Sequence, residues 1–247
     1  MGAVKRTFLW LLFTAAACAS TLWGADAKGK IKVLLLTGGH GFERESFLKV
    51  FQDNPAITFT HVSHGNPDSF AYDRPDLLSY DVVVLYDMLQ KITDAQKRHF
   101  LSLFQHGIGL VATHHALVSY QDWPEFERII GGTYPEDRTQ KGKVTPRLGY
   151  EHDVTVPVVI VARNHPVTEG LKDFTIVDEI YWGFRTRPDI VRLITTTQAR
   201  SGKPLAWART EGKSRVVYLQ LGHGPSAFTN ASYCAFLANS IRWTARR

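Results

Sequence analysis

The chain has 247 residues, of which 44% are hydrophobic and 21% are charged, and this composition suits one globular domain with a full core, or at most two small ones. The formal net charge of +6 is spread along the sequence without a long run of Lys or Arg, which argues against a nucleic-acid partner. There are two cysteines, Cys18 and Cys234, so no intrachain disulfide can form once the first is removed with a leader peptide.

The first 27 residues have the pattern of such a leader. Two basic residues precede an apolar run over residues 8–18, and Ala25-Asp26-Ala27 is an A-x-A cleavage pattern. The apolar run is too short to span a bilayer. We therefore predict a signal peptide over residues 1–27 and a secreted or periplasmic domain over residues 30–245. Cleavage after Ala19 and a lipoprotein anchored through Cys18 stay open as alternatives.

Strand and helix patterns alternate in the first half of the chain. Strands are predicted over residues 32–36, 57–62, 81–86 and 109–113, and helices over residues 43–51, 94–105 and 124–130. Thr93 is a good N-cap for the middle helix, and Gly107 ends it. The third strand lacks alternation, as strands buried on both faces do. These βαβ units predict a parallel sheet.

The second half is richer in strands. A polar stretch over residues 131–151 lacks periodicity, and such segments often cover a site. Pro157 lies within the strand predicted over residues 154–161 and indicates an edge position or an irregularity for it. Strands are predicted over residues 154–161, 176–181, 191–197, 204–209 and 215–221, and a closing amphipathic helix over residues 231–244. No segment after the leader is long and apolar enough to span a membrane.

Histidines follow three of the predicted strands. They occur in Thr37-Gly38-Gly39-His40-Gly41, Ala112-Thr113-His114-His115-Ala116 and Leu221-Gly222-His223-Gly224. The carboxyl ends of strands form the ligand crevice of an open α/β sheet, so we expect four imidazoles in one cleft. Imidazole titrates near neutral pH and is a common metal ligand. The alternative for each is a helix cap or a satisfied buried hydrogen bond.

Two familiar chemistries do not fit these segments. The glycine-rich turn before His40 lacks the spacings of dinucleotide- and phosphate-binding loops, so no nucleotide cofactor is expected. The turn at His114 and His115 lies where related folds carry a nucleophile elbow, but it has neither Ser nor Cys. Acyl transfer through a covalent nucleophile is therefore not predicted there, and one of the two histidines is expected to face away from the cleft.

Other candidates lie outside the three segments. Glu179 is a candidate general base or metal ligand, with a solvated turn as the alternative. His152 follows the irregular stretch and is expected within reach of the cleft. His165 is expected to be structural, and the histidines at positions 61, 64, 99 and 106 are expected on the surface. No short zinc motif occurs, so a metal site would be assembled from distant segments.

In this order, the motifs resemble those of the ThuA-like (trehalose utilisation) family over about residues 31–245. The resemblance rests on Thr-Gly-Gly-His, Thr-His-His-Ala, Asn-His-Pro-Val-Thr-Glu-Gly-Leu, Asp-Glu-Ile-Tyr, Leu-Gly-His-Gly and Asn-Ser-Ile-Arg-Trp-Thr. It implies a flavodoxin-like fold similar to class I glutamine amidotransferases, a three-layer α/β sandwich with a mostly parallel sheet. His114 and His115 fall where an amidotransferase carries its Cys, and His223 falls where it carries its His. Glutaminase activity is therefore not expected.

The resemblance also implies a small carbohydrate substrate, because members are linked to 3-keto-glycosides made by partner sugar oxidoreductases. We predict an exported enzyme that cleaves or converts 3-keto-glycosides or disaccharides by acid–base chemistry, assisted by a divalent metal such as Zn. A non-catalytic carbohydrate-binding module and an unrelated hydrolase are the alternatives.

Roles follow for the individual residues on this hypothesis. His40, His114 and His223 are the expected metal ligands, and Glu179 is expected to transfer protons beside His114 and His223. His115 and His152 are second choices for these roles, and together with His40 they are expected to bind the substrate. The aromatic residues Phe42, Tyr181 and Trp182 are expected to stack on a sugar face, with core packing as the alternative.

Overall fold

The computed structural model describes residues 29–64, 69–135 and 147–247. The predicted signal peptide lies outside these residues, and so does the central part of the irregular stretch. Within the described part of the chain, no helix is long and apolar enough to cross a membrane.

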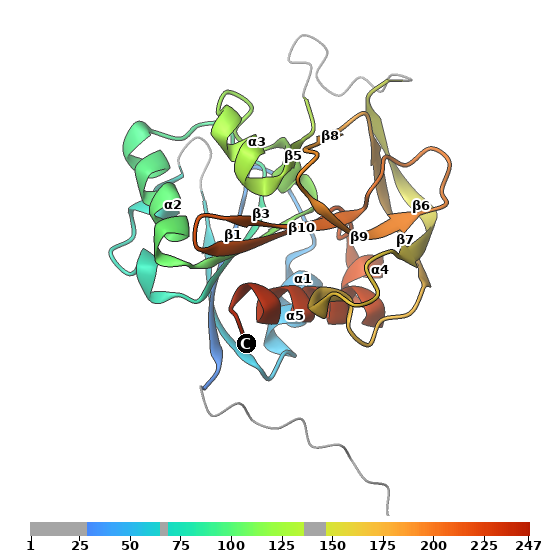
Figure 1. The fold of residues 1–247 in the computed structure, drawn as a ribbon, viewed down its shortest axis with the longest axis horizontal. Coiled ribbons are helices and arrows are strands. Elements are labelled where there is room, and N and C mark those ends of the chain that lie inside the picture. Colours follow the sequence, from blue (N-terminus) through green and yellow to red (C-terminus); the bar gives the residue numbers. More distant parts are fainter. Residues whose placement is uncertain (1–28, 65–68, 136–146) are drawn as a thin grey trace, which may run out of the picture.

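A nine-stranded sheet organises the molecule (Figure 1), with the order β2-β1-β3-β4-β11-β10-β9-β6-β7. The strands are β1 (Ile31–Gly38), β2 (Ile57–Ser63), β3 (Val82–Asp87), β4 (Gly109–Thr113), β6 (Gly149–Ile160), β7 (Phe174–Trp182), β9 (Val191–Thr196), β10 (Ala206–Glu211) and β11 (Ser214–Leu219). The first five in this order are parallel, as in flavodoxin-like folds, and the remaining pairings are antiparallel. Two short strands, β5 (Gly132–Thr133) and β8 (Arg185–Thr186), pair separately.

Helices cover both faces of the sheet. They are α1 (Arg44–Gln52), α2 (Asp94–His106), α3 (Pro124–Ile130), α4 (Pro225–Phe228) and α5 (Ala231–Thr244), with 3-10 turns η1 (Phe70–Asp73), η2 (Leu77–Ser79), η3 (His114–Val118) and η5 (Pro166–Thr168). Figure 1 shows α2 and α3 on one side and α1, α4 and α5 on the other. Each side has its own apolar core against the central strands. The predicted three-layer α/β fold is confirmed.

Local signals placed most elements within a few residues. Thr93 caps α2 in a capping box with Gln96, and Gly107 ends the helix in the left-handed conformation that glycine tolerates. Glu43 is the N-cap of α1 rather than a residue of its first turn, and its carboxylate accepts the N–H groups of Glu45 and Ser46. His165 caps η5 by accepting the N–H of Val167.

The edge position suggested by Pro157 is wrong, because β6 lies between β9 and β7. Pro157 pairs with Thr175 of β7, while the pairing with β9 begins only at Val158. The irregularity of β6 lies further upstream, where the register with β7 shifts between Glu151 and Val154. This bulge contains His152, and such bulges commonly redirect a side chain toward a site.

His64 is not on the surface, contrary to the prediction. His64 is the first residue after β2 and is only 3% exposed. Its Nε2 lies 3.8 Å from Oδ2 of Asp87, which is fully buried. The 3-10 turn η1 covers this end of the edge strand, and the rings of Phe70 and Tyr72 lie beside the His64 ring. Burial raises the pKa of Asp87 to about 7.

We expect Asp87→Asn to flatten the pH dependence of stability. The unfolded chain ionises Asp87 near its ordinary pKa of 3.8, whereas the folded protein holds the proton up to a pKa of about 7. Stability is therefore lost as pH rises through this window, by up to about 4 kcal/mol above pH 7. Urea unfolding at several pH values measures the difference between the two proteins. Asp94→Asn, at an exposed residue of α2, should keep the wild-type profile, and an unchanged Asp87→Asn profile would contradict the assignment.

Candidate active site

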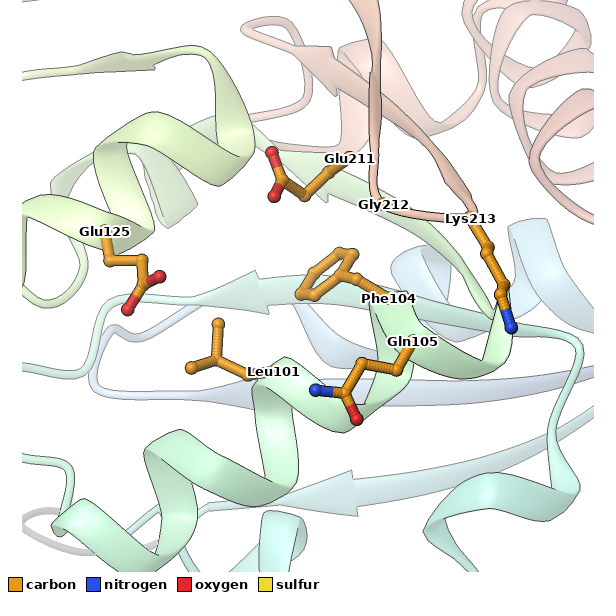
Figure 2. Close-up of a pocket in the computed structure, with 7 residues that line it drawn as sticks. All are labelled: Leu101, Phe104, Gln105, Glu125, Glu211, Gly212 and Lys213. Atoms are coloured by element: carbon orange, nitrogen blue, oxygen red, sulfur yellow. The ribbon is translucent and has the colours of Figure 1, made fainter.

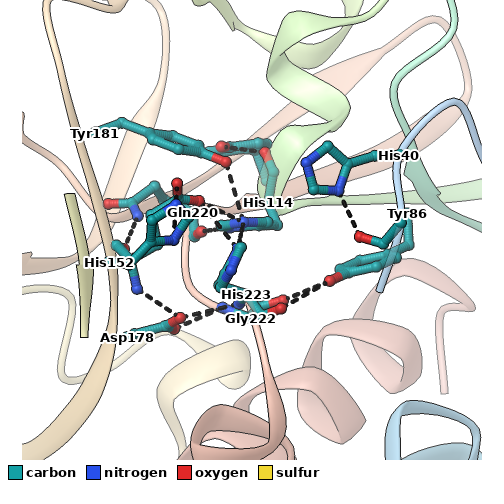
Figure 3. A network of polar contacts seen from close by, with 12 residues as sticks. His40, Tyr86, His114, His152, Asp178, Tyr181, Gln220, Gly222 and His223 are labelled. Carbon is teal, nitrogen blue, oxygen red and sulfur yellow. Dashed lines mark hydrogen bonds and ion pairs between the residues drawn. The ribbon is translucent and has the colours of Figure 1, made fainter. Parts of the chain in front are cut away.

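The antiparallel half of the sheet brings β7 back to the end of β11. Gln220, just after β11, donates its Nε2–H to the backbone oxygen of Glu179 in β7 at 2.8 Å. Glu179 therefore lies beside the histidines that follow β4 and β11, although β7 is at the far edge of the sheet order. The carboxyl ends of the parallel strands and the segment of β7 from Asp178 to Tyr181 thus form one site (Figure 3).

His114, Glu179 and His223 form the centre of this site. Oε2 of Glu179 lies 2.9 Å from Nε2 of His114 and 3.2 Å from Nδ1 of His223. The two imidazole nitrogens are 3.3 Å apart. The structure therefore brings together the three residues that the sequence analysis placed at the chemistry.

The backbone fixes the orientation of His114. Its φ of 51° lies in the left-handed region, which an L-residue adopts at a cost, at the strand-to-helix turn after β4. Nδ1 lies 2.7 Å from the carbonyl oxygen of Gln220. Because a carbonyl can only accept, Nδ1 carries the proton and Nε2 faces Glu179. Tyr218 donates its hydroxyl hydrogen to the carbonyl oxygen of His114 and so stabilises the turn.

The charges in the cluster are mutually stabilised. Burial alone would raise the pKa of Glu179, but hydrogen bonds from His114 and His223 outweigh it and hold that pKa well below its usual range. The hydrogen bond to Glu179 in turn raises the pKa of His223. Glu179 is therefore a stable anion at neutral pH, even though its side chain is 6% exposed.

Asp178 positions the loop that carries His223. It is buried, and its two oxygens accept the backbone N–H groups of Gly222 at 2.7 Å and His223 at 2.9 Å. Gly222 has a φ of 119°, and a β-carbon there would lie 2.6 Å from the hydroxyl of Tyr233. Tyr86, at the end of β3, donates its hydroxyl to the carbonyl of Gly222 from the opposite side.

The remaining candidate histidines surround the centre. His152, carried by the β6 bulge, has Nδ1 3.5 Å from Oε1 of Glu179, and its ring lies 4.5 Å from that of His223. The ring of His40 lies 4.6 Å from His115 and 6.5 Å from His223. His115 is buried behind His40 and against Tyr86, at 4.5 Å between rings. Only His114 of the adjacent pair enters the centre.

The three aromatic candidates differ in their surroundings. Tyr181 is buried, and its hydroxyl lies 3.0 Å from Nε2 of His114, so it belongs to the polar network. Phe42 packs edge-on against Phe47 and Tyr86, which is core packing. Trp182 is half-buried with the Arg200 guanidinium over its ring.

The central triad of His114, Glu179 and His223 fits a small divalent cation better than the ligand set predicted from the sequence, which had His40 in place of Glu179. Its three ligand atoms lie within 4.8 Å of one another, whereas His40 is not among them. A tetrahedral ion with bonds of about 2.0–2.1 Å places its ligand atoms roughly 3.3 Å apart, close to the separations found here. The hydrogen bond from Nδ1 of His114 to a carbonyl is also typical of metal-bound histidine. Glu179 takes the place expected for His40.

Two other hollows lie away from the histidines. One, of about 520 Å³, lies between α2, α3 and the turn after β10 (Figure 2). Its lining residues are Leu101, Phe104, Gln105, Glu125, Glu211, Gly212 and Lys213. Arg128 pairs with both of its carboxylates, which gives them a structural role. The other, of about 660 Å³, is a largely apolar groove between α1 and α5. Neither contains a residue of the central triad.

Three residues of the site escaped the sequence analysis as functional candidates: Tyr86, Asp178 and Gln220. Tyr86 and Gln220 follow the same rule as the histidines, because each lies at or just after the end of a parallel strand. Asp178 was visible as the neighbour of Glu179, but its role as an acceptor for the His223 loop depends on the return of β7.

Comparison with known proteins gives a consistent family. The ThuA family model, described as trehalose utilisation, matches residues 32–244. A ThuA-like protein from Parabacteroides merdae ATCC 43184 has a similar structure, with a TM-score of 0.74 and 23% identity over 87% of this chain and 90% of that one. Another ThuA-like protein, from Bacteroides uniformis ATCC 8492, has a TM-score of 0.63 and 21% identity over 88% and 93% of the two chains.

The same fold occurs inside a larger enzyme. A β-galactosidase from Rahnella sp. R3 matches with a TM-score of 0.58 and 14% identity, over 87% of this chain but 31% of its own. Comparison with proteins of curated function gives no match.

We expect Asp178→Asn to lower the free energy of unfolding by about 2 kcal/mol, since an amide loses one charged acceptor and turns a donor toward a backbone N–H. Urea unfolding measures this loss. Amide hydrogen exchange should show weaker protection at Gly222 and His223. Asp173→Asn is the matched control, because Asp173 also accepts a backbone N–H, from Ile160, but is exposed. Equal losses in the two variants would contradict the role given to Asp178.

Proposed function

The chain belongs to the ThuA (trehalose utilisation) family, and on this premise we propose that it is an enzyme that cleaves 3-keto-glycosides or 3-keto-disaccharides. The predicted signal peptide supports an exported enzyme that receives its substrate from a sugar oxidoreductase. The observation that carries the proposal is that Nε2 of His114, Oε2 of Glu179 and Nδ1 of His223 all lie within 3.3 Å of one another. A catalytic site needs titratable groups within reach of one reacting atom, and this triad meets that condition.

The chemistry of the substrate matches such a site. A ketone at C3 acidifies the proton on C2, and its removal gives an enolate that can expel the C1 substituent. This reaction needs a base, a proton for the leaving oxygen and positive charge near the enolate oxygen. It needs no covalent nucleophile, in agreement with the absence of Ser and Cys from the turn at His114. The imidazoles of the site supply the first two requirements.

His114, Glu179 and His223 are the residues that would hold a divalent cation such as Zn²⁺. When bound, the cation would polarise the C3 carbonyl and stabilise negative charge on its oxygen. Glu179 then serves as a ligand, in keeping with its depressed pKa, which makes it a weak base. The hydroxyl of Tyr181 lies within hydrogen-bond distance of Nε2 of His114 and so adds a neutral polar group beside the triad.

Zn²⁺ titration by calorimetry tests the cation part of the proposal. We expect one ion per chain, and His114→Ala, His223→Ala or Glu179→Gln should lower its affinity by more than about tenfold, the loss that altered outer-shell partners alone can cause. His40→Ala should retain the affinity, because His40 lies outside the triad. His106→Ala, at an exposed position on α2, controls for adventitious imidazole binding. Wild-type protein that binds no Zn²⁺ would contradict this part.

Release of the aglycone from aryl 3-keto-glucosides tests the activity itself. Purified protein should release the aglycone from these compounds but not from the parent glucosides, in which the C2 proton is not acidified. Activity should fall on chelation and should fall by more than about tenfold in His114→Ala, because this variant removes a residue that would hold the cation. Binding of the keto sugar without release under any metal condition would instead support a non-catalytic carbohydrate-binding module.

A further inference from the structure

His40 differs from the other histidines of the site in how its nitrogens are used. Nδ1 lies 2.6 Å from the carbonyl oxygen of Gly41, and since that oxygen only accepts, Nδ1 carries the proton. The lone pair of the neutral ring is then on Nε2. Figure 3 shows this second nitrogen turned toward the side on which His114 and His223 lie. No carboxylate pairs with His40 among the described residues.

The other imidazoles are committed elsewhere. His114 has both nitrogens engaged, one with Gln220 and one with Glu179. His223 directs Nδ1 at Glu179, which raises the pKa of His223, and His152 also directs Nδ1 at this carboxylate. His115 is buried beneath the His40 ring and is 3% exposed. His40 is therefore the one that combines exposure to solvent, a defined lone pair and freedom from an acidic partner.

The surroundings of His40 also favour the neutral ring. Partial burial lowers the pKa of His40, and the neighbouring His114 and His223 act in the same direction. The buried ring of His115 packs against the His40 ring, with 4.6 Å between the ring centres, and so supports it from one side. The turn that carries His40 is rigidly placed, because Met88 donates its N–H to the carbonyl of Gly38 and a β-carbon at Gly39 would lie 2.6 Å from the Met88 carbonyl oxygen.

We propose that His40 is the general base that takes the C2 proton of the 3-keto-glycoside, an assignment that rests on the proposed function. The C2–H bond breaks, the proton moves to Nε2 of His40, and the electron pair forms the enolate of the C3 ketone. As the carbonyl reforms, a C1–C2 double bond forms and the C1–O bond breaks. The leaving oxygen takes up the proton held by His40. Atoms and electrons balance without a further reagent.

This assignment separates the two halves of the reaction in space. His114, Glu179 and His223 act on the C3 oxygen, while His40 acts on C2 from the turn after β1, with its ring centre 6.5 Å from that of His223. In a 3-keto sugar, C2 is bonded to C3, which carries the carbonyl oxygen. One bound substrate can therefore contact His40 with its C2 proton and the triad with its C3 oxygen.

Hydrogen–deuterium exchange at C2 tests the assignment directly. Methyl 3-keto-β-glucoside, whose methoxide is a poor leaving group, is incubated with the protein in D₂O, and loss of the C2 proton signal is followed by NMR. Wild-type protein should catalyse the exchange. His40→Ala should slow it by about 10²-fold or more, and added imidazole should restore much of the loss, because the small base can occupy the vacated position.

His106→Ala is the matched control, since His106 also points Nδ1 at a backbone carbonyl, that of Ser102, but lies on the exposed side of α2. It should exchange C2 at the wild-type rate. Retention of the Zn²⁺ affinity in His40→Ala would show that the variant is folded and that its central triad is intact.

The outcomes separate this inference from the function on which it rests. Wild-type exchange that persists within about threefold in His40→Ala would overturn the role of His40 but leave the enzyme proposal standing. Loss of exchange that imidazole does not restore would also overturn it, in favour of a positioning role. Wild-type protein that neither exchanges C2 nor releases an aglycone would refute the proposed function, and the assignment of His40 would fall with it.

Discussion

Two adjacent buried carboxylates, Asp178 and Glu179, impose the constraint on which the site depends. Ionised carboxylates are costly to bury unless hydrogen bonds and opposite charges replace water. Asp178 finds its partners in the backbone N–H groups of the loop after β11, and Glu179 finds them in the histidines after β4 and β11. These contacts require β7 to return to the parallel half of the sheet, so the antiparallel strands position the site as much as the parallel ones.

The site combines buried residues at its centre with solvent-exposed histidines around them. His114, Glu179 and Tyr181 are buried, and each has its polar atoms fixed by the backbone or by one another. His40 and His152 are exposed to solvent, from a glycine turn and from a β-bulge respectively. Groups that stabilise developing charge act best when they need no reorganisation, and groups that exchange protons need access to substrate and water. On the proposed function, this arrangement places charge-stabilising groups in the buried centre and proton-transferring groups where substrate and water can reach them.

The parallel half of the molecule could be predicted from the sequence because its signals are local. Unbroken apolar runs marked β3 and β4, Thr93 and Gly107 marked the ends of α2, and the rule that ligands gather at strand ends placed His40, His114 and His223 together. The burial of His64 against Asp87 and the return of β7 depend on contacts between distant segments, which no local pattern encodes. For the same reason Glu179, rather than His40, completes the tight triad with His114 and His223.

The turn at His114 shows how one scaffold supports different chemistries. In folds with a nucleophile elbow, a strained strand-to-helix turn presents Ser or Cys, and the turn after β4 is also strained, with a φ of 51°, but carries an imidazole. A buried imidazole paired with Glu179 cannot form an acyl intermediate of the Ser or Cys type, but it can hold charge or a metal ion at the same point. On the proposed function, the backbone geometry of the turn fixes the position of the reactive group, and the side chain at the turn decides which chemistry is available.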